Sequence, residues 1–116
     1  GISGARYNLV IAKKYAAVQI EFGRSSKEEN KKLFDELIKS KDTIEQQLGY
    51  KLDWKRNDAK ISCQVSYALV GVSLYTPEDW NKALTFLATN IISLEKAMRN
   101  PLKEIKKVLN TNEDDE

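Results

Sequence analysis

Asp53 and Lys55 are the two residues whose types and spacing come nearest to a catalytic motif. Mg²⁺-dependent nucleases carry a D-x-K element on a strand, where the acid holds the metal and the lysine polarises the attacking water. That chemistry needs a second acid on a neighbouring strand, but residues 60–67 contain none, and Glu21 belongs to another predicted hairpin. Alternating acid and base on a solvated strand is the commoner arrangement, so we expect neither a catalytic residue nor a metal ligand here.

The rest of the composition argues against most enzyme classes. The chain has no histidine, which removes Ser–His–Asp and Cys–His systems, histidine general bases and nearly every zinc site. Its one cysteine, Cys63, falls on the apolar side of a predicted strand, and we expect it to be a small core residue. One cysteine excludes an intrachain disulfide and suits a reducing cytoplasm. No glycine-rich nucleotide motif occurs, so we predict a protein that is not an enzyme and has no cofactor.

A binding surface is the better candidate for function. Strand alternation predicts one polar sheet face that is open to solvent, made by Asn8, Gln19, Glu21, Asp53, Lys55, Ser62, Gln64 and Ser66. Polar sheets that bind single-stranded nucleic acid usually carry stacking aromatics, and the nearest here are Tyr15 and Trp54. We expect Trp54 to point into the core instead. The candidate contacts to nucleic acid or to a partner domain are Lys51, Lys55, Arg56, Lys60, Gln19 and Gln64.

Net charge gives weak support for a polyanionic partner. The 116 residues carry a net charge of +2, but four of the last five are acidic. Without those four, 13 acidic groups remain against 19 basic ones, a net charge of +6 on residues 1–111. This surplus is far below that of a dedicated nucleic-acid-binding domain. No apolar run approaches the roughly 20 residues of a membrane span, and we expect a cytoplasmic protein.

The central element that must position this surface is a helix over residues 76–99. Thr76 is a suitable N-cap, Pro77 suits the first helical position, and Glu78 and Asp79 complement the helix dipole. Helical spacing then gives an apolar stripe at Trp80, Ala83, Leu84, Leu87, Ala88, Ile91, Leu94 and Met98. Asn100 and Pro101 are expected to end this helix and begin a short third one.

Two hairpins and one further helix complete the predicted domain. Residues 6–12 and 18–22 alternate as a hairpin that buries Tyr7, Leu9, Ile11, Val18, Ile20 and Phe22. A capping box at Ser25 or Ser26 starts a helix that we expect to continue to Leu48, before Gly49. Residues 52–55 and 61–67 then form a second hairpin. We therefore predict an α+β fold, a two-layer ββαββα domain over residues 6–109. Its four-stranded antiparallel sheet would carry two long helices on one face.

The two ends of the chain are predicted to lie outside this domain. The sequence opens with GISG and has no initiating Met, so residues 1–5 are expected to be a cloning remnant or linker. Residues 110–116 are expected to be a disordered acidic tail.

The first helix and second hairpin also resemble a known family. The segments KEENKKLFDELIKSKDTIEQQLG (27–49), LDWKR (52–56), EDW (78–80) and LEKAMR (94–99) are similar to a prokaryotic C-terminal domain of unknown function. The resemblance implies a larger protein whose preceding half is often restriction-endonuclease-like, and hence a DNA-related context. That family has no assigned catalytic residues, so none is transferred to this chain.

Three functions follow from these observations. The first is a non-catalytic accessory module of a larger DNA-processing-type protein, which contacts an upstream domain, DNA or RNA. The second is a self-association module, a homodimer in which either the third helix or the sheet pairs with its copy across a two-fold axis. The third is the Mg²⁺-dependent nuclease that would use Asp53 and Lys55.

Overall fold

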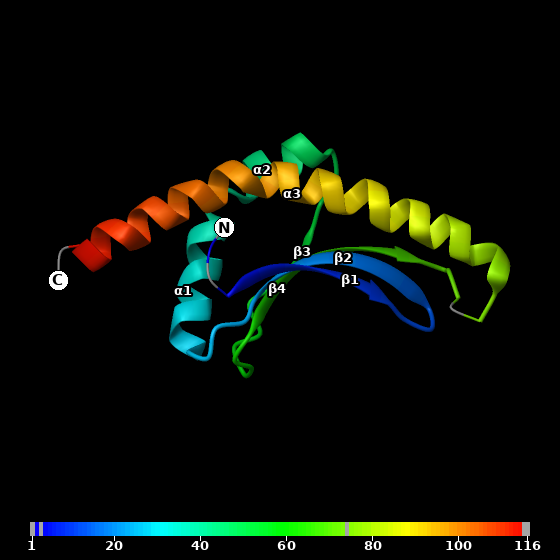
Figure 1. The fold of residues 1–116 in the computed structure, drawn as a ribbon, viewed down its shortest axis with the longest axis horizontal. Helices are drawn as coiled ribbons and strands as arrows, with labels where there is room; N and C mark the ends of the chain where they lie inside the picture. The colour runs from blue at the N-terminus through cyan, green and yellow to red at the C-terminus, as the bar shows by residue number, and fades with distance from the viewer. Residues whose placement is uncertain (1, 3, 74, 115–116) are drawn as a thin grey trace.

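The computed structural model describes residue 2, residues 4–73 and residues 75–114, with side chains as far as Val108. The chain forms two layers, a twisted sheet and a layer of helices on one of its faces (Figure 1). Along the chain the elements are β1 (Ala5–Ile11), β2 (Tyr15–Phe22), α1 (Lys27–Ile38), α2 (Lys41–Leu48), β3 (Asp53–Lys55), β4 (Cys63–Val70) and α3 (Pro77–Asp114). The predicted α+β fold is confirmed in outline, but the order of elements is ββααββα.

The sheet has the order β1-β2-β4-β3, and every neighbouring pair is antiparallel, as predicted. Its two central strands supply most of the buried side chains. In β2 the core face is formed by Val18, Ile20 and Phe22, and in β4 by Cys63 and Val65, all five with no exposed surface. The predictions that Cys63 packs in the core and that these strands bury one face are confirmed.

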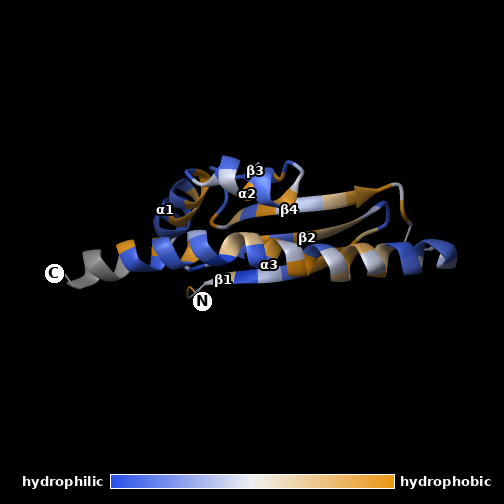
Figure 2. Ribbon diagram, turned by 90° about the horizontal axis from the view of Figure 1, so that it is seen from above, coloured by the Kyte–Doolittle hydropathy of each residue, from blue (hydrophilic) through white to orange (hydrophobic). Residues whose placement is uncertain are grey.

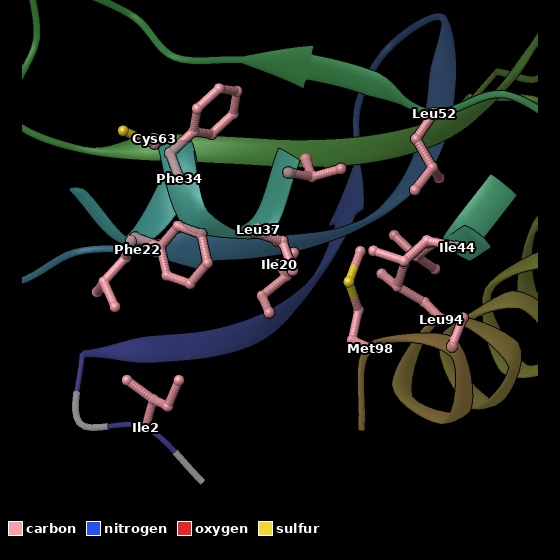
Figure 3. Packing of buried hydrophobic residues seen from close by; sticks show 14 of the residues in the cluster. Ile2, Ile20, Phe22, Phe34, Leu37, Ile44, Leu52, Cys63, Leu94 and Met98 are labelled. Atoms are coloured by element: carbon pink, nitrogen blue, oxygen red, sulfur yellow. The ribbon is translucent and has the colours of Figure 1, made fainter. Parts of the chain in front are cut away.

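The first predicted helix is not continuous, and this prediction was wrong. α1 ends at Ile38 and α2 begins at Lys41, with Ser40 at the N-cap of α2. The Ser40 side chain makes no capping hydrogen bond, so the only local feature that favours a new helix start is Asp42, whose negative charge in the first turn complements the dipole of α2. Ile44 of α2 then lies beside Leu94 and Met98 of α3 (Figure 3). Gly49 ends α2 in the left-handed conformation, as expected.

The last helix is longer than predicted, because no break occurs at Pro101. α3 runs through this proline as far as Asp114, so the separate third helix was a wrong prediction. Proline removes one backbone donor, but the apolar stripe continues past it through half-buried Leu102 and buried Ile105. Burial of that continued stripe favours one helix over two. At about 1.5 Å per residue, α3 is about 57 Å long and overhangs the sheet at both ends.

Both predicted terminal segments overlap the folded part of the chain. Ile2 is buried in the core, and the Gly4 carbonyl accepts a hydrogen bond from the Gly23 N–H at 2.8 Å. The expected tail over residues 110–116 coincides in part with the end of α3, and residues 115–116 lie outside the described residues.

Several apolar side chains that were expected in the core are exposed. Seen from above, α3 runs lengthwise over β1 and β2, while α1 and α2 lie beside β4 (Figure 2). Leu9 shares the core face of the sheet with Val18 but is 57% exposed, because β1 is an edge strand. Ile61 lies in the loop before β4 and is 56% exposed. On α3 the predicted stripe is wider than the buried face, and Trp80 and Leu84 are exposed.

Candidate interaction surfaces

The register of the sheet brings seven of the eight predicted polar side chains together on its uncovered face; Ser62 lies before β4 instead, and Arg6 joins the face. Arg6, Glu21, Gln64 and Lys55 form one cross-strand row, and Asn8, Gln19, Ser66 and Asp53 form the next. We call these eight residues the open face. Its alternation was readable from the sequence because antiparallel partners directly opposite one another point to the same side.

Charges on the open face cancel one another. Arg6 Nε contacts Glu21 Oε1 at 3.1 Å, and Lys55 Nζ contacts Asp53 Oδ2 at 3.4 Å. Glu21 also accepts a hydrogen bond from Gln64 Nε2 at 3.1 Å, and this bond is the main reason that the pKa of Glu21 is lowered. The face is therefore a neutral hydrogen-bonding surface and does not present a cluster of cations to a phosphate backbone.

The six predicted contact residues do not form one patch. Gln19, Gln64 and Lys55 share the open face, whereas Arg56 is turned toward α1. Its Nε lies 2.9 Å from Asp35 Oδ1 and its Nη1 pairs with Asp58, so that its pKa is raised and the pKa of Asp35 is lowered. Lys51 and Lys60 are exposed in the loops that flank β3.

Asp53 and Lys55 make an exposed ion pair at the edge of the sheet. Their cross-strand partners are Ser66 and Gln64, and Glu21 lies two strands away from Lys55, opposite Gln64. Within the described part of the chain, no three His, Cys, Asp or Glu side chains are grouped so that they could hold a metal ion.

A buried polar network, which the sequence did not indicate, fastens the loop between β3 and β4 to α1. Lys31 is only 7% exposed, and its Nζ donates to the carbonyls of Arg56 (2.6 Å), Asn57 (2.8 Å) and Ser62 (3.1 Å). It also lies 3.3 Å from Cys63 Sγ, whose pKa is raised by burial. The neighbouring Asn30 is fully buried, and its side chain bonds the backbone at Arg24 and Ile61 (2.8–2.9 Å). Apart from the contact to Cys63 Sγ, every bond of this network ends on a backbone atom, so the network holds the loop in place.

An apolar groove lies between the tip of the β1–β2 hairpin and the first turns of α3. It has a volume of about 210 Å³ and is lined by Ile11, Ala12, Tyr15, Ala16, Val72, Ser73, Trp80, Ala83 and Leu84. Ile11 and Leu84 remain 49% and 56% exposed at its rim. Apolar side chains that gather in a concave and exposed site are typical of a docking surface.

The strand that borders this groove has a free edge. β1 has one hydrogen-bonded neighbour, β2, so alternate residues direct their N–H and C=O groups away from the sheet. The Ala12 N–H to Tyr15 carbonyl bond at the hairpin turn (2.9 Å) sets the phase. Ala5, Tyr7, Leu9 and Ile11 are therefore the residues whose backbone groups point outward, and the Ala5 N–H donates to the Ile2 carbonyl at 3.1 Å.

A second, basic cleft lies further along the same side of α3. Ile2, Tyr7, Glu95, Arg99, Leu102, Lys103 and Lys106 line about 410 Å³. Burial of the Tyr7 ring, with a smaller contribution from the Glu95 charge, raises the pKa of its hydroxyl to about 12. The two clefts give α3 an apolar first half and a basic second half along β1.

Comparisons with known proteins identify a family but no described relative. No curated protein matches the chain, and no solved structure does. Among the described residues, no helix has both the length and the apolar character required to cross a bilayer. A family model described as "Domain of unknown function (DUF4268)" matches residues 1–102. The chain therefore belongs to this family, in agreement with the resemblance seen in its first helix and second hairpin.

Proposed function

We propose that this domain is a non-catalytic interaction module, and that its apolar groove docks a protein partner. The observation that carries the proposal is the exposure of Ile11, Trp80 and Leu84 around one concave apolar site. Burying an exposed side chain of this size contributes roughly 1.5–3 kcal/mol, so a partner that covers all three gains a substantial favourable term.

A protein is favoured over nucleic acid as the partner because of the charge arrangement. Lys55 and Arg6 on the open face are each engaged by a carboxylate, so this face offers little net attraction to phosphates, and Arg56 is paired with Asp35 of α1. The groove, in contrast, is lined almost entirely by carbon. A restriction-endonuclease-like half, as implied by the family resemblance, would be a partner of the right class if it presents an apolar ridge.

Site-specific photo-crosslinking in cells that produce the full-length polypeptide tests this function. A benzophenone amino acid replaces Leu84, and the same label at Ile61 is the control, because both side chains are 56% exposed and Ile61 lies at the other end of the sheet. We expect a single discrete adduct from position 84, whose partner peptide is identified by mass spectrometry, and its loss when Ile11→Lys is added. Equal labelling from both positions, or no adduct from position 84, would refute the proposal.

A further inference from the structure

We infer that the partner docked along β1 is a second copy of this chain, paired antiparallel through Arg6–Val10 of both copies, beyond the Ala5 N–H that already donates to the Ile2 carbonyl. The inference rests on the proposed function, since it assigns the occupant of the same surface. It joins the two sheets into one of eight strands and places the two α3 helices side by side.

Beyond Ala5, whose N–H donates to the Ile2 carbonyl (3.1 Å), β1 lacks the features that normally protect an edge strand. It is seven residues long and contains no proline and no lysine, and its register with β2 has no bulge. Its single charge, Arg6, is engaged by Glu21 on the open face. The strand at the opposite edge, β3, is only three residues long and carries two charges. Pairing is therefore favoured at β1.

The sequence of β1 is compatible with its own reversed copy. Overlap of Arg6–Val10 centres the two-fold axis on Asn8, and the outward backbone groups of Tyr7 then meet those of Leu9 in the other copy. On the open face Asn8 lies opposite Asn8 and Arg6 opposite Val10, so no like charges are paired. On the core face Leu9 lies opposite Tyr7 and Ile11 opposite Ala5, which covers the two exposed aliphatic side chains.

The charge distribution on α3 favours the same antiparallel arrangement. Its first turn carries Glu78 and Asp79, and its later turns carry Arg99, Lys103 and Lys106 along the cleft beside β1. The two-fold axis reverses one α3 relative to the other, so the acidic start of each helix approaches the basic stretch of its copy. The exposed apolar rim at Trp80 and Leu84 is covered in the same step.

Sedimentation equilibrium on the 116-residue chain measures the mass directly. We expect twice 13.2 kDa, and a shift to 13.2 kDa for Leu9→Lys, which puts a charge at the centre of the shared strand. Val70→Lys is the matched control, because Val70 is an exposed aliphatic residue on another strand, and it should remain dimeric. Circular dichroism checks that each variant is folded.

A cysteine on the two-fold axis tests the register. Two copies of Asn8→Cys would face one another at about 4.5–5.5 Å between Cα atoms, within the range of a disulfide. Copies of Arg6→Cys would lie about 13 Å apart and should not cross-link, at roughly 3.3 Å per residue over four residues. We expect a covalent dimer of Asn8→Cys alone under oxidising conditions, since native Cys63 is buried.

The outcomes separate this inference from the proposed function. A monomeric mass at high concentration, together with a position-84 adduct to a different protein, overturns the second copy and leaves the docking function standing. A dimer that Leu9→Lys does not dissociate, or that cross-links equally through both cysteine variants, overturns the assigned interface. A monomeric mass with no adduct from position 84 removes both.

Discussion

Replacing Lys31 with methionine should destabilise the domain by about 3.5 kcal/mol. The ammonium group donates three hydrogen bonds to backbone carbonyls in a nearly solvent-free site, at 2.6, 2.8 and 3.1 Å. A bond from a charged donor contributes about 1.5–3 kcal/mol, so three at the lower limit are worth about 4.5 kcal/mol. Methionine keeps the apolar stem and recovers roughly 1 kcal/mol through its added carbon burial.

Urea denaturation followed by circular dichroism measures this loss. With a slope of about 1.5 kcal/mol/M, the unfolding midpoint should fall by about 2 M. The matched control is Lys32→Met, which changes the adjacent exposed lysine on α1 and should alter stability by less than about 0.5 kcal/mol. Equal midpoints for the two variants would show that the network holding the loop between β3 and β4 contributes nothing measurable.

Two smaller perturbations test other parts of the fold. Ser26→Ala removes the acceptor of the Glu29 N–H (3.2 Å) and should lower the free energy of unfolding, measured with urea, by about 1 kcal/mol. Ser25→Ala, just outside the cap, should leave it unchanged. Similar losses for both variants would contradict the assignment of Ser26 as the cap. The pKa of Glu21 is lowered from 4.5 in the folded state, chiefly by the Gln64 hydrogen bond. The contribution of Glu21 to the free energy of unfolding is therefore fully present above pH 4.5 and is lost as the pH falls through the lower pKa of the folded state. Glu21→Gln should therefore flatten the decline in unfolding midpoint between about pH 6 and about pH 3, and an unchanged slope would refute this role.

The fold was predictable where one local pattern matched one environment. Period-2 alternation gave the face of Val18, Ile20 and Val65 correctly, since central strands are covered by helices. It gave the face of Leu9 correctly but not its burial, because the pattern of an edge strand does not reveal whether a helix covers it. At Pro101 a break was predicted from local propensity, but burial of the apolar stripe beyond it keeps α3 continuous. At Ser40 continuity was predicted from the apolar stripe, but the chain breaks there into α1 and α2.

The candidate site was predictable only in part. The open face followed from alternation, but the pairing of its charges depends on the register between strands. Arg6 lies opposite Glu21 only because of the geometry of the β1–β2 turn, which the sequence did not specify. The apolar groove joins residues about 70 positions apart, Ile11 and Leu84, and no sequence period links them. Lys31 gave no signal because a lysine on a helix is normally solvated, and only the fold places three carbonyls around it.

If β1 pairs with a second copy, the unequal edges of the sheet would limit assembly to two chains. β3 pairs with only Gln64–Ser66 of β4 and leaves a stepped, charged border, which cannot accept a straight incoming strand along its length. Fibre growth requires two interaction surfaces per molecule, so that each added molecule still offers a free surface to the next. A chain with a single pairing edge would form a closed dimer and add no further copies. Exposed Leu9 and Ile11 on β1 could then be retained without leading to aggregation.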